Sequence, residues 1–443
     1  MAKIIPFQGI LYNPKKVYDL ADVVTPPYDV ISKPAQQNFY ESHPQNIIRL
    51  ILGITTENDT TKNNPHTRAA DFFNRWISEG VLVQDKSPAF YLTTAEFFLE
   101  SKMVTRLGLI ALVGLEPFKK GIILPHEETF SRVKSERLEL MKACHANFSP
   151  IFSLYSDNKN HILNLLKDAV LNKKPDIDFT DKKGLRHRLW RIIDPALHRF
   201  VSEALQKKTL FIADGHHRYE TALNYRDWIS NNNSDFNEDH PANYVMMHLS
   251  SMEDPGLTIL PAHRMVTGVQ ASKLATLIQE GENYFDIITI PFAGNELEKA
   301  QPQFISILKS NSSKNIIGVV IKDRPEFYLL TLKPRVMQQM FGNKLADSLR
   351  SLDVTVLTRL VLNEMLGFDQ NSLDDEKLIT YSSCEKEAIN AAVAGKCDIA
   401  FILNPTKIKQ MKNVAQQGLT MPRKSTYFYP KVITGLVMNK LTT

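Results

Sequence analysis

The sequence is poor in cysteine and has no long apolar run, and each shortage excludes a class of protein. Three cysteines, Cys144, Cys384 and Cys397, occur in 443 residues, and no two of them form a CxxC pair. This number is too small for a disulfide framework, and the spacing indicates neither a zinc site nor a thioredoxin-like redox site. The longest apolar stretch, Leu107 to Leu115, has nine residues and is too short to span a bilayer.

A signal peptide and a strong excess of one charge are also lacking. After Lys3, Pro6 and Gln8 interrupt the amino-terminal segment, which therefore does not resemble a secretory leader. The net charge of +5 comes from 53 basic and 48 acidic residues spread along the chain, which argues against a nucleic-acid partner. We expect a cytoplasmic protein without a membrane partner. The sequence leaves the oligomeric state open.

The length predicts two or more domains, and composition shifts suggest where they meet. We expect an N-terminal α+β region over 1–185, a central α/β unit over 186–265 and a C-terminal α/β region over 266–443. The fold class is a mixture of α+β and α/β. The expected helices are 66–80, 131–146, 196–207, 386–394 and 406–416, and the expected strands are 89–99, 103–115, 189–193, 209–213, 244–249, 399–403 and 432–438, with a further hairpin at 316–332.

The most informative segment follows the predicted strand 209–213. Asp214 and Gly215 form a tight turn, and His216, His217 and Arg218 stand at the head of a predicted helix. We expect Asp214 to cap that helix and Gly215 to let a ligand approach the backbone. The free N–H groups of a helix start, its positive dipole end and Arg218 favour an anion, and the histidines add donors or a base. The pattern indicates phosphate chemistry, although such a histidine pair can also be structural.

Three other segments concentrate reactive residue types. Consecutive prolines within 25–29 present Tyr28 and Asp29 from a rigid loop. A histidine beside a carboxylate, as in His126-Glu127 within 124–129, can perform acid–base work or hold a divalent metal. The segment 260–264 ends in His263-Arg264 after a strand-like run, where side chains often meet at a cleft. His126 and His263 fit a structural role equally well.

Five separated segments resemble, in the right order, the domain-of-unknown-function 1015 family. They are 25–31 (TPPYDVI), 124–129 (LPHEET), 147–152 (NFSPIF), 212–222 (IADGHHRYETA) and 424–430 (KSTYFYP). The resemblance covers nearly the whole chain, but the family name implies no activity. The segment 424–430 also offers Lys424, Ser425 and Thr426, which could contact a phosphate or form a surface turn.

The Asp-Gly-His-His-Arg turn more distantly resembles the phosphate-binding turn of the ParB/sulfiredoxin superfamily, which includes the free serine kinases. Sulfiredoxin has a cysteine where this chain has His216, so sulfinic acid reduction is not expected. No helix-turn-helix pattern of the ParB kind is evident. The resemblance implies a ParB/sulfiredoxin-like α/β core with additional mixed-sheet domains. It also implies phosphotransfer that depends on a nucleotide, ATP or ADP, and on Mg²⁺, with serine or phosphoserine as the small molecule.

Together these patterns predict a phosphotransferase or phosphohydrolase with one site, although the direction of transfer stays open. The alternatives are a ParB-like nucleotide-binding regulatory module without turnover and a DNA-processing nuclease. We expect Tyr28-Asp29, His126-Glu127 and His263-Arg264 to converge on the turn 214–218. The expected catalytic residues are His217, His216, Glu127 and Asp29; the phosphate or nucleotide contacts are Asp214, Gly215, His216, Arg218, Thr129 and Arg264; and the substrate contacts are Tyr28, His126 and His263. Metal ligands are not identified.

Overall fold

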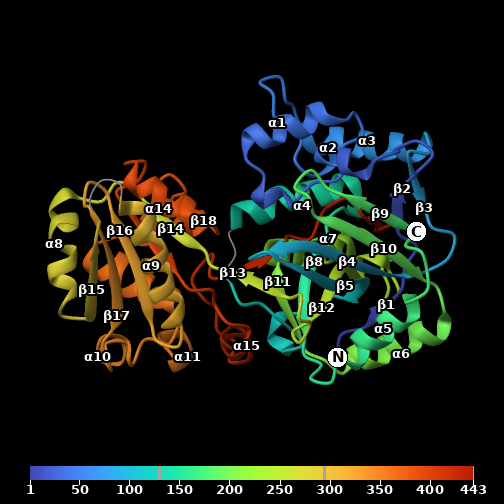
Figure 1. Cartoon of the computed structure of the whole chain (residues 1–443). Coiled ribbons are helices and arrows are strands. Elements are labelled where there is room, and N and C mark those ends of the chain that lie inside the picture. The colour runs from blue at the N-terminus through green and yellow to red at the C-terminus, as the bar shows by residue number, and fades with distance from the viewer. Residues whose placement is uncertain (128–130, 293–295, 443) are drawn as a thin grey trace. The chain divides into compact units, whose positions relative to one another are not determined.

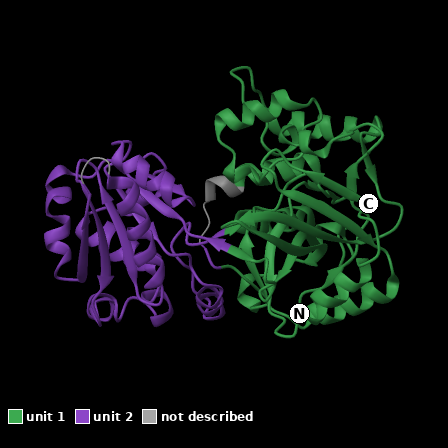
Figure 2. Ribbon diagram, in the orientation of Figure 1, with its two compact units in different colours: residues 1–125, 129–258, 428–443 green, residues 126–128, 259–427 purple. Residues whose placement is uncertain are grey.

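The computed structural model describes residues 1–127, 131–292 and 296–442 and divides into two compact units (Figure 2). Unit 1 comprises 1–125, 129–258 and 428–443, and unit 2 comprises 126–128 and 259–427. The chain therefore leaves unit 1 after residue 258 and returns to it at residue 428. Strands β13 (Thr258–Leu260) and β20 (Tyr427–Tyr429) lie at these two passages. The three regions expected from composition stay a prediction.

Unit 1 is built on a nine-stranded mixed sheet (Figure 1). The strand order is β6-β11-β8-β12-β5-β4-β10-β9, and β1 also pairs with β5. β12 is parallel to β8 and β11 is parallel to β6, whereas the other described pairs are antiparallel. The strands are β1 (Ile4–Ile5), β4 (Phe90–Leu99), β5 (Lys102–Gly114), β6 (Ile123–Leu124), β8 (Ile151–Tyr155), β9 (Ile177–Thr180), β10 (Arg186–Ile192), β11 (Leu210–Asp214) and β12 (Tyr244–Ser251).

The hairpin of β4 and β5 confirms the sequence prediction and forms the middle of this sheet. Glu100 and Ser101 connect the strands with φ angles of 46° and 67°, the positive values that a two-residue type I′ turn requires. Both faces of β5 are covered, because Leu109 and Ala111 belong to one apolar cluster while Ile110 and Leu112 belong to another. Coverage on both sides explains why the run 107–115 is apolar without alternation.

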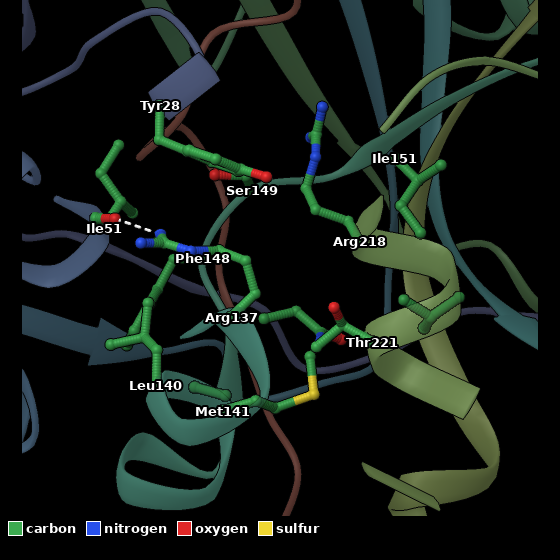
Figure 3. Close-up of a pocket in the computed structure, with 13 residues that line it drawn as sticks. Tyr28, Ile51, Arg137, Leu140, Met141, Phe148, Ser149, Ile151, Arg218 and Thr221 are labelled. Carbon is green, nitrogen blue, oxygen red and sulfur yellow. Dashed lines mark hydrogen bonds between the residues drawn. The ribbon is translucent and has the colours of Figure 1, made fainter. Parts of the chain in front are cut away.

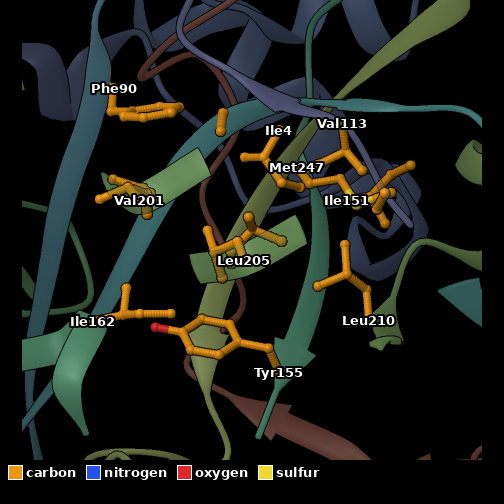
Figure 4. Packing of buried hydrophobic residues seen from close by; sticks show 14 of the residues in the cluster. Ile4, Phe90, Val113, Ile151, Tyr155, Ile162, Val201, Leu205, Leu210 and Met247 are labelled. Carbon is orange, nitrogen blue, oxygen red and sulfur yellow. The ribbon is translucent and has the colours of Figure 1, made fainter. Parts of the chain in front are cut away.

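The largest core of unit 1 lies between the sheet and the helices α5 (His161–Val170), α6 (Pro195–Gln206) and α7 (His216–Asn232). Figure 4 shows Val201 and Leu205 of α6 packed among strand residues such as Met247. α6 begins as predicted, because Asp194 accepts a hydrogen bond from Ala196 N–H and proline occupies the first helical position.

A second, helical part of unit 1 has its own apolar core, around Phe73 and Trp76. Its helices are gathered on one side of unit 1 in Figure 1, next to α4. They are α1 (Lys33–Ser42), α2 (Ile48–Ile51) and α3 (Pro65–Ser78), with the short 3-10 helices η1 (Leu20–Asp22) and η2 (Tyr28–Val30), and α4 (Ser131–Cys144) contributes Cys144 to the same core. Two further 3-10 helices of unit 1 belong to other cores: η3 (Phe118–Lys120) packs on the largest core and η4 (Pro241–Asn243) contributes to a small cluster around Tyr225. Two small sheets pair β2 (Ile10–Tyr12) with β3 (Leu82–Gln84) and β7 (Ala146–Asn147) with β21 (Asn439–Lys440).

Unit 2 contains a six-stranded antiparallel sheet in the order β15-β17-β16-β19-β14-β18. Its strands are β14 (His263–Val266), β15 (Phe285–Pro291), β16 (Ile316–Ile321), β17 (Glu326–Leu332), β18 (Ile379–Ser382) and β19 (Ile399–Leu403). Its helices are α8 (Ala271–Gly281), α9 (Leu297–Ser310), α10 (Val336–Phe341), α11 (Asp347–Arg350), α12 (Asp353–Thr355), the π-helix η6 (Val356–Met365), α13 (Gln370–Asp374), α14 (Glu385–Val393) and α15 (Ile408–Gln416). The protein is thus a mixed α/β protein with one large mixed sheet and a second, antiparallel sheet.

Some local predictions are corrected by the structure. The segment 432–438 is not a strand; it makes isolated backbone bridges at Thr434 and Met438, and the strand follows at β21. Strands β10 and β11 follow one another along the chain, as predicted, but they are not neighbours in the sheet. None of the helices in the described ranges has the length and apolar character that a membrane crossing needs.

Candidate functional site

The Asp-Gly-His-His-Arg turn joins strand β11 to helix α7 in unit 1. β11 ends at Asp214, Gly215 adopts φ = 94°, and α7 begins at His216. The prediction that Asp214 caps the helix is wrong, because Gly215 occupies the cap position. A Cβ atom on Gly215 would lie 2.8 Å from Nε of Arg218. A glycine at this position therefore permits both the left-handed backbone conformation and the close approach of the Arg218 guanidinium.

The carboxylate of Asp214 is held between two cations instead. Its Oδ2 accepts a hydrogen bond from Arg218 Nη2 at 2.6 Å, and its Oδ1 pairs with Lys431 Nζ. All three side chains are largely buried. Burial raises the pKa of Asp214, but Lys431 and Arg218 outweigh it and hold that pKa below its usual value. Asp214 is thus ionised and fixes Arg218, which also donates to the Pro150 carbonyl.

A small cavity of about 60 Å³ opens beside this turn (Figure 3). Arg218 and Thr221 reach it from one face of α7, and Tyr28 reaches it from η2. The remaining wall is formed by the end of α2, by α4, by the segment before and at the start of β8 and by β12. It consists of Ile51, Arg137, Leu140, Met141, Ala146, Asn147, Phe148, Ser149, Ile151 and Val245. Three of the five family-like segments, 25–31, 147–152 and 212–222, therefore contribute to one cavity.

Two guanidinium groups and three hydroxyl groups stand in the otherwise mostly apolar lining of this cavity. The Arg137 guanidinium is 8% exposed, lies 4.4 Å from the centre of the Tyr28 ring and donates from Nη1 to the Ile51 carbonyl at 2.5 Å. Within the described part of the chain, Nε of Arg137 and the buried Thr221 hydroxyl have no hydrogen-bond partner. Burial and the nearby Asp29 raise the pKa of Tyr28 to about 12, so its hydroxyl remains a donor at neutral pH. The lining suits an anion.

Four other predicted site residues stand close, along the sequence, to residues that line this cavity. Asp29 is exposed on η2, directly after Tyr28. His216 is 6% exposed at the first position of α7, and His217, which follows it, is partly buried. Gly215 lies under the Arg218 guanidinium, as described above. The structure therefore brings Tyr28 and Arg218 into one cavity and places the histidines at the start of the helix that lines it.

Within unit 2, the predicted residues His126 and Glu127 form a cluster with Ser425 and Thr426. His126 is fully buried, with its Nε2 2.9 Å from the Thr426 hydroxyl. Glu127 Oε1 accepts from Ser425 N–H at 3.2 Å, so the segments 124–129 and 424–430 meet at these residues. Thr129 lies outside the described residues. The convergence of this cluster with the turn 214–218 stays a prediction.

His263 and Arg264 on β14 are also buried in unit 2. His263 is 1% exposed, and its Nδ1 accepts from Leu403 N–H at 3.1 Å. Burial lowers the pKa of His263 to about 4, so the ring is neutral at physiological pH. Arg264 is 2% exposed and donates from Nη2 to the Arg423 carbonyl at 3.3 Å. These surroundings are those of core side chains, and their predicted ligand contacts stay a prediction.

Sequence reasoning missed Arg137 and Lys431. Arg137 has a signal, because it stands in register with Leu140, Met141 and Cys144 on the apolar stripe of α4. An arginine on such a stripe must be satisfied by a buried partner or a ligand. Lys431 has no local signal, because its partner Asp214 is 217 residues away.

Replacing Gly215 with alanine is expected to lower the free energy of unfolding by about 2–3 kcal/mol, from left-handed strain and from the clash with Arg218. Gly184→Ala is the matched control. Its φ is 82°, and no neighbouring heavy atom in the described chain lies within 4 Å of the added Cβ. It should therefore lose about 1 kcal/mol, from strain alone. Urea unfolding measures both, and equal losses would show that the Gly215–Arg218 contact contributes nothing.

Within residues 1–127, 131–292 and 296–442, His, Cys, Asp and Glu side chains do not gather in threes that could hold a metal ion. In phosphoryl transfer, Mg²⁺ commonly uses one or two carboxylates together with water and substrate phosphates. The exposed carboxylate of Asp29, beside Tyr28, fits that requirement.

Several solved structures are similar to this chain at low identity. A mutant of a free serine kinase in complex with ADP has 12% identity and a TM-score of 0.34, covering 69% of this chain and 84% of that one. SbnI with a C-terminal truncation, from Staphylococcus aureus, has 10% identity and a TM-score of 0.33, covering 73% and 85%. A conserved hypothetical protein from Pyrococcus furiosus has 12% identity and a TM-score of 0.34, covering 72% and 92%. Similarity at this level transfers no residue roles.

A search of curated proteins finds no match. One family does match, and it does so over most of the sequence. The sequence profile described as "Protein of unknown function (DUF1015)" matches residues 4–355. This range includes all of unit 1 except residues 1–3 and its returning segment 428–443. It also contains the segments 25–31, 124–129, 147–152 and 212–222, on which the resemblance was based. The chain belongs to the DUF1015 family.

Proposed function

We propose that the protein transfers a phosphoryl group between a nucleotide, ATP or ADP, and a small hydroxylated metabolite, with serine as the best candidate, or hydrolyses the phosphorylated product. The observation that carries this proposal is that two guanidinium groups, of Arg137 and Arg218, line one cavity at the signature turn. Phosphoryl transfer depends on charge neutralisation and positioning more than on covalent chemistry by the protein. Fixed cations and hydroxyl donors within the lining of one cavity support that kind of reaction.

The environment of Arg218 prepares it for this role. Its guanidinium is fixed by Asp214 and by the Pro150 carbonyl, so its position is set before any ligand arrives. A preorganised cation stabilises developing negative charge without reorganising during the reaction. Arg137 adds a second charge, with its Nε unpartnered among the described residues. Tyr28 and Ser149 supply hydroxyl groups at the same cavity.

The remaining roles follow the sequence prediction. His217 donates to the transferring group or protonates the leaving oxygen, and His216 is proposed as a further donor to the phosphate or as a base. Asp29 accepts the proton of the attacking hydroxyl or helps to hold Mg²⁺, which would neutralise the phosphate oxygens when bound. Glu127 is the alternative carboxylate that activates the attacking hydroxyl or water. Thr129 and Arg264 are proposed as phosphate or nucleotide contacts, and His126 and His263 as substrate contacts. A ParB/sulfiredoxin-like core is the corresponding proposal for the fold.

The full-length protein is tested with L-serine, Mg²⁺ and either ATP or ADP, followed by ³¹P NMR, and in reverse with O-phosphoserine. We expect phosphoserine to form, or phosphoserine to be consumed, only when protein and Mg²⁺ are both present. Thermal shift with each component gives an independent readout, because ligands that bind the folded state raise the melting temperature. Stabilisation by nucleotide without any phosphoryl transfer would contradict the proposal and favour a binding module.

A further inference from the structure

A second and larger cavity lies in the helical part of unit 1. It has a volume of about 470 Å³, within the range typical of small-molecule sites. Its walls come from the start of α1, the end of α2 and the residues after it, the start of α3, and α4. The lining residues are Ile31, Lys33, Gln36, Ile51, Leu52, Gly53, Thr55, Asn64, Pro65, His66, Glu136, Arg137 and Leu140.

The large cavity adjoins the small one through a shared wall. Ile51, Arg137 and Leu140 line both. Arg137 is therefore the charged group common to the two spaces, and its Nε has no hydrogen-bond partner within the described chain. Glu136, whose side chain is 56% exposed, accepts from Arg137 Nη2 at 2.5 Å and so pairs with one edge of the guanidinium while Nε stays without a partner in the described chain.

The lining of the large cavity is mixed rather than uniformly charged. Ile31, Leu52 and Pro65 give it apolar surface, in addition to the shared Ile51 and Leu140. Hydrogen-bonding groups stand among them, including the Thr55 hydroxyl and the His66 ring. Burial and the charge of Arg137 lower the pKa of His66, which favours a neutral ring that can both donate and accept. Lys33 adds an exposed ammonium group on α1.

We infer that the large cavity binds the nucleoside part of a nucleoside di- or triphosphate, with the phosphates directed past Arg137 into the small cavity. This inference rests on the proposed function and assigns a place to its nucleotide. A flat heteroaromatic base needs apolar walls and hydrogen-bonding edges together, and the large cavity offers both. A lipid chain would require a continuous apolar lining, and a free sugar would require a more polar one.

The experiment fills the large cavity and leaves the small one open. Thr55 is exposed at the cavity lining, so Thr55→Trp should fold while its ring occupies part of the space. Thr180→Trp, at an exposed position of strand β9 that lines neither cavity, is the matched control. Calorimetric titration compares ADP with inorganic pyrophosphate, which carries the charge without the nucleoside. Circular dichroism verifies the fold of each variant.

We expect Thr55→Trp to weaken ADP binding about tenfold or more, since loss of the base contacts removes a substantial part of the affinity. Pyrophosphate binding should remain at the wild-type level, and Thr180→Trp should bind both as the wild type does. Equal ADP affinity in Thr55→Trp and wild type would overturn the inference, as would an equal loss of ADP and pyrophosphate. Should Thr55→Trp not fold, Lys33→Trp at the α1 wall is measured in the same way.

Failure of this inference and failure of the proposed function give different results. If ADP binds but Thr55→Trp has no effect, the assignment of the cavity is wrong and phosphoryl transfer can still occur. If Thr55→Trp selectively loses ADP but the wild type transfers no phosphoryl group, the cavity is assigned correctly and the reaction is wrong. If wild-type protein does not bind ADP, both are wrong.

Discussion

Turnover is expected to fall about 100- to 1,000-fold when His217 is replaced by alanine, while the melting temperature stays near that of the wild type. His217 is the second residue of α7 and is followed by Arg218, which lines the small cavity. Arg218 and the helix start should still hold the phosphate in the variant. Loss of the His217 ring then lowers the rate of the chemical step, because one hydrogen-bond donor to the developing charge is lost.

The control for this experiment is His161→Ala, which removes an exposed histidine at the first position of α5 and should change neither quantity. Steady-state turnover and thermal unfolding are measured for both variants with nucleotide, Mg²⁺ and serine or phosphoserine. A structural histidine behaves in the opposite way, since its removal leaves partners unpaired and costs about 1–3 kcal/mol. A His217→Ala protein that melts early but retains its turnover per folded molecule would refute the catalytic role.

The free energy of unfolding of unit 1 is expected to fall by about 3–5 kcal/mol when Asp214 is replaced by alanine. The substitution leaves Lys431 and Arg218, each with a side chain only 12% exposed, without the carboxylate between them. Uncompensated buried charge is costly because the surrounding protein solvates it poorly. Urea unfolding followed by circular dichroism measures the loss.

Asp227→Ala is the matched control on the same helix, α7. Asp227 pairs with Arg226 at 3.1 Å, but its side chain is 64% exposed, so the loss should be below about 1 kcal/mol. Removing Lys431 together with Asp214, as Asp214→Ala with Lys431→Met, should recover part of the stability because one stranded cation disappears. Similar losses for Asp214→Ala and Asp227→Ala would show that the buried network does not stabilise unit 1.

The same network predicts how the effect of Asp214→Ala depends on pH. The pKa of Asp214 is lower in the folded protein than in the unfolded chain, so the folded state binds fewer protons. Its contribution is complete above the unfolded value of about 4 and is lost as the pH falls towards the folded value. The difference between wild type and Asp214→Ala should therefore be constant from neutral pH down to about 5 and shrink below that.

Local patterns predicted much of the secondary structure. The β4–β5 hairpin and α6 follow from short-range rules, namely apolar strands around a two-residue turn and an Asp-Pro helix start. The strand-to-helix change at Asp214 and Gly215 was also predicted, although the cap was placed one residue too early. The error has a physical cause: the Asp214 side chain pairs with Lys431 and Arg218 rather than with the helix N–H groups.

Long-range pairing could not be predicted from one sequence. Strand order is an example, because β11 lies between β6 and β8 although β10 precedes it in the chain. Residues 157–187, which are mostly polar, similarly contain α5 and β9. The apolar side chains of these two elements could not be assigned to a core without knowing the sheet against which they pack. In the candidate site, Tyr28 and Arg218 were predicted and lie in one cavity. Arg137 was missed because a single arginine on an amphipathic helix is ordinarily a surface residue.

The return of the chain to unit 1 at residue 428 has a consequence for the order of biosynthesis. Translation proceeds from the amino terminus, so all of 259–427 leaves the ribosome before Lys431 does. Until then Asp214 has Arg218 but lacks its second cation, Arg106 lacks the Pro430 carbonyl and β7 lacks β21. A nascent chain that stops anywhere within unit 2 carries every residue that lines the small cavity, yet the carboxylate of Asp214 beside it is incompletely neutralised.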